Sequence, residues 1–322
     1  MFRIPNLQGR EAEDAIKYPD ECREAVLVLS HKFGRAERRL LAGLSSSLCS
    51  KSRDFFLLCH AEDNEAKRDI QGHLRRSQSV AEPWFFSLRE IQDAGFPMLR
   101  DTIVPGSTHL PLLLFSMRNP QYDYIWLIEY DVRFSGKWPW FFDYWRGSTA
   151  HFLTCRLQPH HENPTWYWWK SLSLKDPLPL PALIRSFNPI YRISRDACRF
   201  LVESSRAGNV GHYEVLVPTL LLREGFVLED LGGVGPFVAP KNTACFYTSM
   251  HPNHKPKYAR ATFRWRPEWH SVGLRRDSLY HPVKRDLPRF IGLPLTNLAS
   301  VYYAVKGEIP GLRRFIRAIA RA

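Results

Sequence analysis

The chain has 322 residues, of which 44% are hydrophobic and 24% are charged, so it is long and apolar enough to bury a core and is not a disordered protein. Its longest apolar run, residues 110–115, is far shorter than the roughly 20 residues that a membrane-spanning helix needs. The net charge of +13 at pH 7 predicts an anionic ligand, such as nucleic acid, an acidic membrane surface or a phosphate-bearing substrate.

The first part of the chain has the pattern of strands that alternate with helices. Residues 24–31 are apolar and rich in β-forming residues, and they precede a helical stretch at 35–48. Apolar runs at 54–59 and 83–88 predict two further strands. This alternation is typical of a mostly parallel sheet with helices on both faces, so the predicted fold class is α/β.

The strongest signal for a buried strand is at residues 124–128, which read Tyr-Ile-Trp-Leu-Ile. This strand leads directly into Glu129, Tyr130 and Asp131. Open α/β sheets bind their ligands beyond the carboxyl ends of the strands. The acidic triplet is therefore the first candidate for a functional site.

The second half of the chain contains further elements and then a long stretch rich in Pro, His and aromatic residues. Strands are predicted at 150–156, 187–194 and 226–228, and helices at 196–205 and 213–223, the last weakened by an internal proline. The predicted division has four parts: an N-terminal extension at 1–23, the main α/β domain at 24–235, a loop-rich part at 236–309 that completes the active site, and a basic amphipathic helix at 310–322.

The two ends of the chain carry the predictions about location. Residues 310–322 place apolar side chains on one face of a predicted helix and arginines elsewhere, and such a helix docks on its own domain or rests on an anionic membrane surface. Residues 1–18 lack the apolar core of a secretory signal. The protein is therefore predicted to be cytoplasmic, with a peripheral position at the inner face of the membrane if the helix binds lipid.

Glu129 and Asp131 are separated by one residue, and alternation along an extended strand would place both side chains on the same side. Neighbouring carboxylates repel each other, and a divalent cation such as Mg²⁺ or Mn²⁺ relieves the repulsion while it also binds phosphate oxygens. The pair therefore indicates a metal site for a diphosphate. A solvated acidic turn after a strand is the alternative interpretation.

An apolar strand followed by Glu-Tyr-Asp resembles the Asp-x-Asp motif of the GT-A type nucleotide-sugar glycosyltransferases, with Glu in place of the first Asp. The resemblance implies a Rossmann-like GT-A fold and hexosyl transfer from a nucleotide diphosphate to a glycan or glycolipid, with Mn²⁺ or Mg²⁺ as cofactor. Glu129 and Asp131 would bind the metal, and Glu129 and Tyr130 would contact the donor. In this fold the first strand ends at the nucleotide, which implies further donor contacts from Ser30, His31 and Arg35.

Inverting GT-A enzymes often carry an acidic residue at the start of a helix, followed later by a Gly-aromatic pair that enters a strand. The segment Gly-His-Tyr-Glu at 211–214 and the pair Gly225-Phe226 resemble this arrangement, which makes Glu214 the candidate general base. A glutamate at this position also stabilises the helix through the macrodipole, so a structural role is the alternative. Glu229-Asp230 is the second candidate for the base.

Many GT-A enzymes also supply a late histidine as a metal ligand, with a basic residue near it. In the segment Leu-Tyr-His-Pro-Val-Lys, His281 fits the ligand and Lys284 could offset the charge that grows on the diphosphate. His212 and His270 compete for the role of ligand, and single histidines are more often structural. Together with Glu-Tyr-Asp-Val-Arg-Phe and Gly-His-Tyr-Glu-Val, this segment is also similar to a poorly characterised, bacterial-type group of GT-A-like proteins, which implies no particular substrate.

Three other interpretations follow from the composition and the motifs. The aromatic residues Trp166, Tyr167, Trp168 and Trp169 suit stacking on a sugar ring, or they form a core cluster. A basic, aromatic-rich protein could bind single-stranded nucleic acid, but the Lys and Arg residues are spread along the chain and no RNA-binding motif is present, so nucleic acid is not an expected partner. A metal-dependent hydrolase is the third class, although the sequence lacks a dense cluster of ligands.

Overall fold

The computed structural model describes most of the chain between Cys22 and Lys284. The described ranges are 22–30, 35–45, 52–76, 81–249, 261–266 and 268–284. The predicted extension at 1–23 falls almost entirely outside these residues, and the predicted helix at 310–322 falls entirely outside them. No helix among the described residues has the length and apolar character needed to cross a membrane.

A seven-stranded sheet forms the centre of the molecule, in the order β3-β2-β1-β4-β7-β6-β8. Its strands are β1 (Glu24–Leu29), β2 (Arg53–His60), β3 (Glu82–Phe86), β4 (Tyr124–Glu129), β6 (Phe152–Pro159), β7 (Ile184–Ser194) and β8 (Leu228–Asp230). All strands run in the same direction except β7, which is antiparallel to both β4 and β6. The predicted α/β class, with a mostly parallel central sheet, is confirmed.

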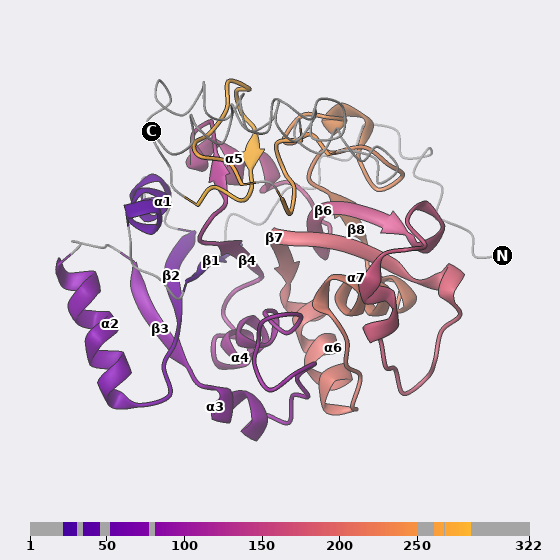
Figure 1. Ribbon diagram of the computed structural model, residues 1–322, viewed down its shortest axis with the longest axis horizontal. Helices are drawn as coiled ribbons and strands as arrows, with labels where there is room; N and C mark the ends of the chain where they lie inside the picture. The colour runs from indigo at the N-terminus through magenta and orange to yellow at the C-terminus, as the bar shows by residue number, and fades with distance from the viewer. Residues whose placement is uncertain are drawn as a thin grey trace, which may run out of the picture.

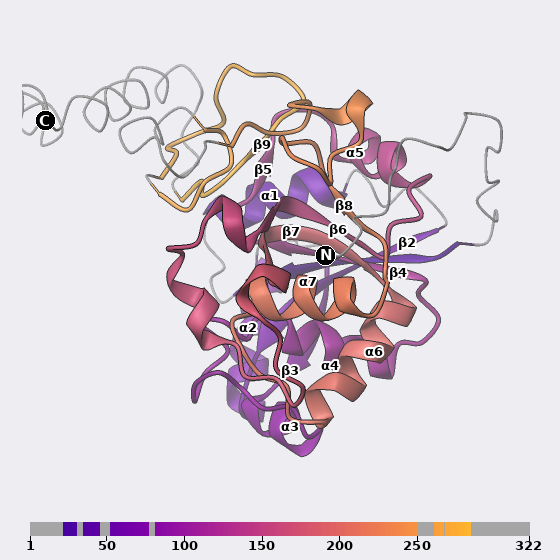
Figure 2. The same cartoon turned by 90° about the vertical axis from the view of Figure 1, so that its right-hand side faces the viewer.

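Helices cover both faces of the sheet (Figures 1 and 2). They are α1 (Arg35–Ser45), α2 (Asn64–Arg76) and α5 (Trp138–Trp145) on one face, and α3 (Leu88–Asp93), α4 (Leu110–Arg118), α6 (Arg195–Arg206) and α7 (Tyr213–Arg223) on the other. Successive residues of a strand point to opposite faces. Accordingly, Val26 and Val28 belong to the core under α1 and α5, whereas Ala25 and Leu27 belong to the core under α4 and α6.

Helix α7 contains Pro218 in its interior, at the position that weakened the sequence prediction. Proline has no N–H, so the Glu214 carbonyl, four residues earlier, cannot receive its usual helical hydrogen bond. The Ser186 hydroxyl of β7 donates to this carbonyl instead, at 3.4 Å. The helix predicted at 213–223 is therefore present over its full length, with a bond from the sheet in place of the missing one.

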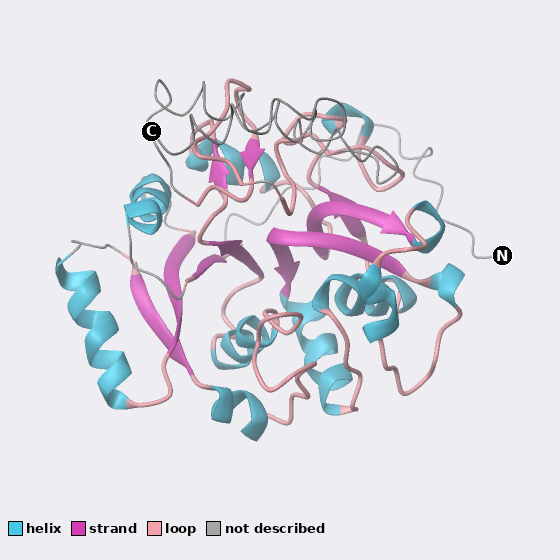
Figure 3. Ribbon diagram, in the orientation of Figure 1, coloured by secondary structure: helices cyan, strands magenta, loops and turns pink. Residues whose placement is uncertain are grey.

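The described residues after β8 lie mostly in loops, as Figure 3 shows, with the short 3₁₀ helix Pro240–Asn242. Its last described strand, β9 (Leu279–Tyr280), pairs antiparallel with β5 (Arg133–Phe134), which follows β4. Phe246, Phe263 and Leu279 lie in the same core cluster as Trp126 of β4. The loops are thus packed onto the sheet, and β9 brings a late segment to the end of β4.

A buried group of charged side chains ties the strands together near the amino ends of β1 and β2. The Glu24 carboxylate accepts hydrogen bonds from Arg53 Nε at 2.7 Å and from Trp126 Nε1 at 3.4 Å, and it lies 3.7 Å from Arg192 NH1. Arg53 also pairs with Asp143 of α5 at 2.8 Å. Glu24, Arg53 and Arg192 are all buried, so the two cations share one buried carboxylate.

Candidate active site

A tight turn follows β4 and carries the acidic triplet. Strand β4 ends at Glu129, and Val132 N donates to the Glu129 carbonyl at 3.0 Å. The Arg133 guanidinium donates to the carbonyls of Tyr130 and Val132 at 2.8 and 2.7 Å, which fixes the turn. The extended strand therefore stops before Asp131, and the alternation expected from the sequence does not reach it. The two carboxylates are brought together by a turn instead.

The pairing of β5 with β9 carries His281 to this turn. Arg133 is paired with Tyr280, and His281 follows Tyr280 directly. Val283 N donates to the Asp131 carbonyl at 2.8 Å, which holds the two segments together. The late histidine thus reaches the acidic turn through a two-residue ladder and one further backbone bond.

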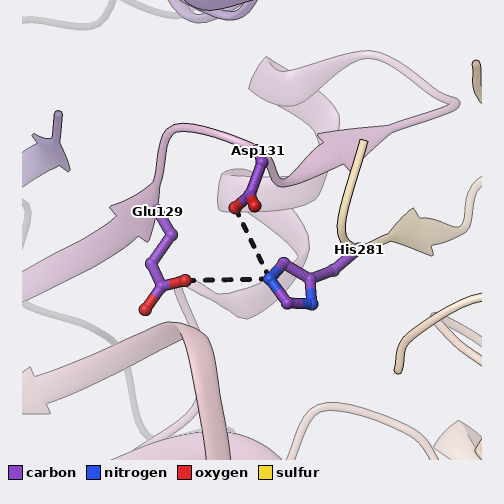
Figure 4. A group of neighbouring side chains, drawn as sticks. All are labelled: Glu129, Asp131 and His281. Carbon is purple, nitrogen blue, oxygen red and sulfur yellow. Dashed lines mark ion pairs between the residues drawn. The ribbon is translucent and has the colours of Figure 1, made fainter. Parts of the chain in front are cut away.

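Glu129, Asp131 and His281 form a group of potential metal ligands (Figure 4). One ligand atom from each residue lies within 4.8 Å of the other two. His281 Nε2 is 3.7 Å from Glu129 Oε2 and 3.4 Å from Asp131 Oδ1. Asp131 and His281 are buried, whereas Glu129 is partly exposed, so the group opens to solvent on the side of Glu129.

The orientation of the His281 ring is set by its other nitrogen. Nδ1 lies 2.8 Å from the Arg264 carbonyl, which can only accept, so Nδ1 carries the proton and Nε2 faces the carboxylates. Burial lowers the pKa of His281, but the Asp131 and Glu129 carboxylates outweigh burial and raise this pKa to about 9. In the metal-free protein the imidazole is therefore a cation between two anions.

The donor set fits a divalent metal. Asp131 Oδ1 is buried and accepts no well-aligned hydrogen bond from the part of the chain that the structure describes; its compensating cation in the metal-free protein is the His281 imidazole at 3.4 Å, a role that a bound metal ion would take over. A buried acceptor of this kind is costly unless a cation or donor compensates it. Two carboxylates and one imidazole nitrogen around a common centre supply the oxygen and nitrogen ligands that Mn²⁺ accepts.

Lys284 adds a second cation to the same turn. Its Nζ pairs with Asp131 Oδ2 and donates to the Tyr130 hydroxyl, the latter at 2.8 Å. Burial opposes ionisation of Asp131, but His281 and Lys284 outweigh burial and hold the pKa of this carboxyl below its usual range. The sequence-predicted residues Glu129, Tyr130, Asp131, His281 and Lys284 therefore lie in one place.

Glu214 is buried in the first turn of α7. Asn188 N of β7 donates to Glu214 Oε1 at 3.4 Å. Burial raises the pKa of Glu214 to about 7, against the opposing effect of Arg185. A carboxyl group with this pKa is half ionised near neutral pH, which suits a group that must accept a proton there.

His212 caps α7, and its geometry shows that it is neutral. Its Nδ1 accepts a hydrogen bond from Glu214 N at 3.3 Å, and burial lowers its pKa to about 3. The 3.9 Å approach of Nδ1 to Glu214 Oε2 is therefore not an ion pair. His212 holds the start of the helix and lies outside the group of metal ligands.

The metal-ligand group and the start of α7 lie side by side. The Tyr213 hydroxyl donates to Glu129 Oε1 at 3.4 Å, so the residue next to Glu214 touches the first carboxylate of the triplet. Sequence reasoning missed Tyr213, because the only signal was its position before Glu214, which says nothing about the neighbouring strand.

The remaining predicted donor contacts are only partly described. Ser30 follows Leu29, which is paired with Glu129, so Ser30 lies at the same edge of the sheet as the triplet. It is buried, and its N donates to the Leu58 carbonyl at 3.4 Å. His31 and the side chain of Arg35 lie outside the described residues.

Glu229 and Asp230, the second candidate for the general base, accept hydrogen bonds from neighbouring residues. Asp230 accepts hydrogen bonds from Tyr247 Oη at 2.8 and 2.9 Å, from Leu157 N at 3.1 Å, and from two glycine N–H groups. Glu229 accepts one from Ser148 Oγ at 2.7 Å. His270, a competitor for the role of ligand, is not in the metal-ligand group.

The four aromatic residues at 166–169 differ in their surroundings. Trp169 lies in a small core cluster, and the Tyr167 side chain is 73% exposed. Trp168 stacks on His212 with ring centroids 4.4 Å apart, and the Arg185 guanidinium lies 4.2 Å from the centre of the Trp166 ring. These residues are thus divided between core packing and the surroundings of the Glu214 helix, and Tyr167–Ser171 form a 3₁₀ helix.

Comparison with known proteins gives one family match and several distant structural likenesses. Residues 78–151, which include the acidic triplet, match a family described as a protein of unknown function, DUF3405. No curated protein matches the sequence.

Three solved structures illustrate the structural likenesses. A protein described as a glucose-1-phosphate thymidylyltransferase from Bacillus anthracis is 12% identical, with 66% of this chain and 88% of that chain covered and a TM-score of 0.37. Glucosyl-3-phosphoglycerate synthase from Mycobacterium tuberculosis, with Mn²⁺ and UDP, is 12% identical over 65% and 68% of the two chains, with a TM-score of 0.37. The galactosyltransferase LgtC is 10% identical over 65% and 73%, with a TM-score of 0.39.

Proposed function

We propose that the protein is a metal-dependent glycosyltransferase of the GT-A type, which moves a sugar from a nucleotide diphosphate to a glycan or glycolipid acceptor with inversion. The observation that carries the proposal is the meeting of Glu129, Asp131 and His281 at the carboxyl edge of the sheet. A buried glutamate with a raised pKa lies on the adjoining helix. A metal-dependent transfer with inversion would use both the metal site and this base.

In the proposed enzyme, Glu129, Asp131 and His281 hold Mn²⁺ or Mg²⁺, which when bound neutralises charge on the diphosphate oxygens. The imidazole ligand favours Mn²⁺ over Mg²⁺, because Mg²⁺ prefers oxygen ligands alone. Lys284 adds positive charge at the same turn, where negative charge grows as the diphosphate leaves. Tyr130 keeps Lys284 in this position through its hydroxyl.

Glu214 serves as the general base in this proposal. An acceptor hydroxyl attacks the anomeric carbon, and Glu214 takes the hydroxyl proton as the new C–O bond forms. The bond from the anomeric carbon to the diphosphate oxygen breaks, and its electron pair leaves with the diphosphate. Attack from the side opposite to the leaving group inverts the configuration at that carbon.

Donor, acceptor and membrane contacts complete the proposal. Ser30, His31 and Arg35 are proposed to contact the nucleotide, which the position of Ser30 beside the triplet supports. Trp166 and Trp168, next to the start of α7, are proposed to contact the acceptor. The predicted helix at 310–322 would hold the enzyme on anionic lipid if the acceptor is a glycolipid.

The test is calorimetry with Mn²⁺ and a panel of nucleoside diphosphates. The wild-type protein should bind one of them only when Mn²⁺ is present, and both a chelator and Glu129→Ala with Asp131→Ala should abolish the binding. The matched control is Glu65→Ala with Asp69→Ala, which removes two exposed carboxylates from α2 and should bind as the wild type does.

Two results would contradict the proposal. One is nucleotide binding that does not depend on Mn²⁺ and is the same in the Glu129→Ala, Asp131→Ala variant. The other is release of free sugar at full rate without any acceptor, which would indicate a hydrolase.

A further inference from the structure

The two oxygens of the Glu129 carboxylate have different neighbours. Oε1 accepts a hydrogen bond from the Tyr213 hydroxyl at 3.4 Å, whereas Oε2 lies 3.7 Å from His281 Nε2. One oxygen is therefore held by a neutral donor on α7, and the other faces the centre of the metal-ligand group (Figure 4).

Tyr213 is itself held in place by contacts that do not involve Glu129. Its N donates to the Gly106 carbonyl at 2.8 Å, and its ring stacks on His109 with an interplanar angle of 7°. Gly106 has a φ of +99°, and a Cβ on it would lie 2.6 Å from Leu99 and 3.2 Å from His212, so this close approach requires glycine. The hydroxyl of Tyr213 thus projects from a ring and a backbone that are already fixed.

Glutamate at the first position of the triplet creates a need for such a donor. It has one rotatable bond more than aspartate, and fixing a long side chain in one conformation costs free energy. Glu129 is also the most exposed of the three ligands, so it is the one least restrained by packing. A hydrogen bond to one oxygen reduces the number of conformations and leaves the second oxygen free to bind a cation.

We propose that Tyr213 is a positioning residue of the metal site, whose hydroxyl holds Glu129 Oε1 so that Oε2 faces the metal. This inference rests on the proposed function, because the contact between Tyr213 and Glu129 has this role only if Glu129 is a metal ligand. Since Tyr213 and Glu214 are consecutive, one helix turn would then position both a metal ligand and the general base.

The test compares Tyr213→Phe with the wild type in Mn²⁺ binding and in the visible spectrum of the Co²⁺-loaded protein. The substitution removes the hydroxyl and keeps the ring against His109 and the backbone bond to Gly106. Loss of a group that orients a metal ligand typically lowers affinity about 10- to 100-fold, so Mn²⁺ affinity should fall by at least about tenfold. The Co²⁺ absorption bands should shift, while the melting temperature without metal should remain that of the wild type.

The matched control is Tyr191→Phe. Tyr191 is buried in β7, and its hydroxyl makes no hydrogen bond within the described part of the chain. This variant should keep the wild-type Mn²⁺ affinity and Co²⁺ spectrum. If both variants lose affinity equally, the effect comes from packing and the inference is overturned.

The double variant of Tyr213→Phe with Glu129→Asp provides a second measurement. Because the shorter side chain withdraws from the hydroxyl, Tyr213→Phe should change Mn²⁺ affinity less in this background than in the wild type. Equal losses in both backgrounds would overturn the inference. If the wild-type protein binds no metal, the proposed function itself is wrong. If the wild type binds metal and Tyr213→Phe binds it equally well, only the role assigned to Tyr213 is wrong.

Discussion

Glu214→Gln should lower turnover by a factor of about 10² to 10⁴, the contribution of a positioned general base, without weakening Mn²⁺ or nucleotide binding. Glutamine has almost the same shape, and its carbonyl oxygen can still accept the hydrogen bond from Asn188 N. The measurement is the initial rate of nucleoside diphosphate release with acceptor, alongside calorimetric binding of the same nucleotide. A rate loss that accompanies an equal loss of binding would contradict the assignment.

The pH dependence of the turnover rate provides a second test of Glu214 as the base. Burial places the pKa of Glu214 at about 7, and only the ionised form accepts a proton. The wild-type rate should therefore rise with pH through about 7 and level off above it, and the residual rate of Glu214→Gln should lack this rise. The control is Glu229→Gln, whose carboxylate is bonded to Ser148. If that variant loses turnover while Glu214→Gln does not, Glu229 is the base.

Glu24→Gln should destabilise the folded protein by about 3–5 kcal/mol, the usual result of removing one partner from a buried ion pair. The substitution keeps the size of the side chain but leaves the buried Arg53 and Arg192 guanidinium groups without their shared carboxylate. The free energy of unfolding is measured by urea denaturation, with circular dichroism as the signal.

The control for this prediction is Asp93→Asn. It breaks the Arg89–Asp93 pair, whose side chains are 86% and 71% exposed, and exposed pairs of this kind contribute about 0.3–0.5 kcal/mol. Equal effects of the two substitutions would show that the buried carboxylate does not hold the strands together.

Much of the sheet could be predicted from the sequence, because its strands are short runs of apolar β-formers. The strands expected at 24–31, 54–59 and 124–128 correspond to β1, β2 and β4. Apolar pattern does not encode strand direction, so the reversed orientation of β7 could not be predicted. Three strands extend beyond their predicted bounds: β6 continues to Pro159, β7 begins at Ile184 and β8 continues to Asp230. Backbone pairing with a neighbouring strand continues where the apolar run stops.

The candidate site could be anticipated residue by residue, but its assembly could not. The grouping of His281 with Asp131 depends on β5 and β9, which are two residues long and therefore too short to give a periodic signal. The contact of Tyr213 with Glu129 joins residues 84 positions apart and follows from the packing of α7 on β7, the strand next to β4. Sequence spacing carries no information about such a contact.

The start of α7 carries two consecutive side chains with different tasks in the proposed enzyme. Successive residues of a helix point about 100° apart, so Tyr213 and Glu214 reach different neighbours from one rigid turn. Inserting a single residue between His212 and Tyr213 would move both side chains out of place together. Libraries that seek a new acceptor preference should therefore vary side chains around Trp166 and Trp168, and leave the length of this segment untouched.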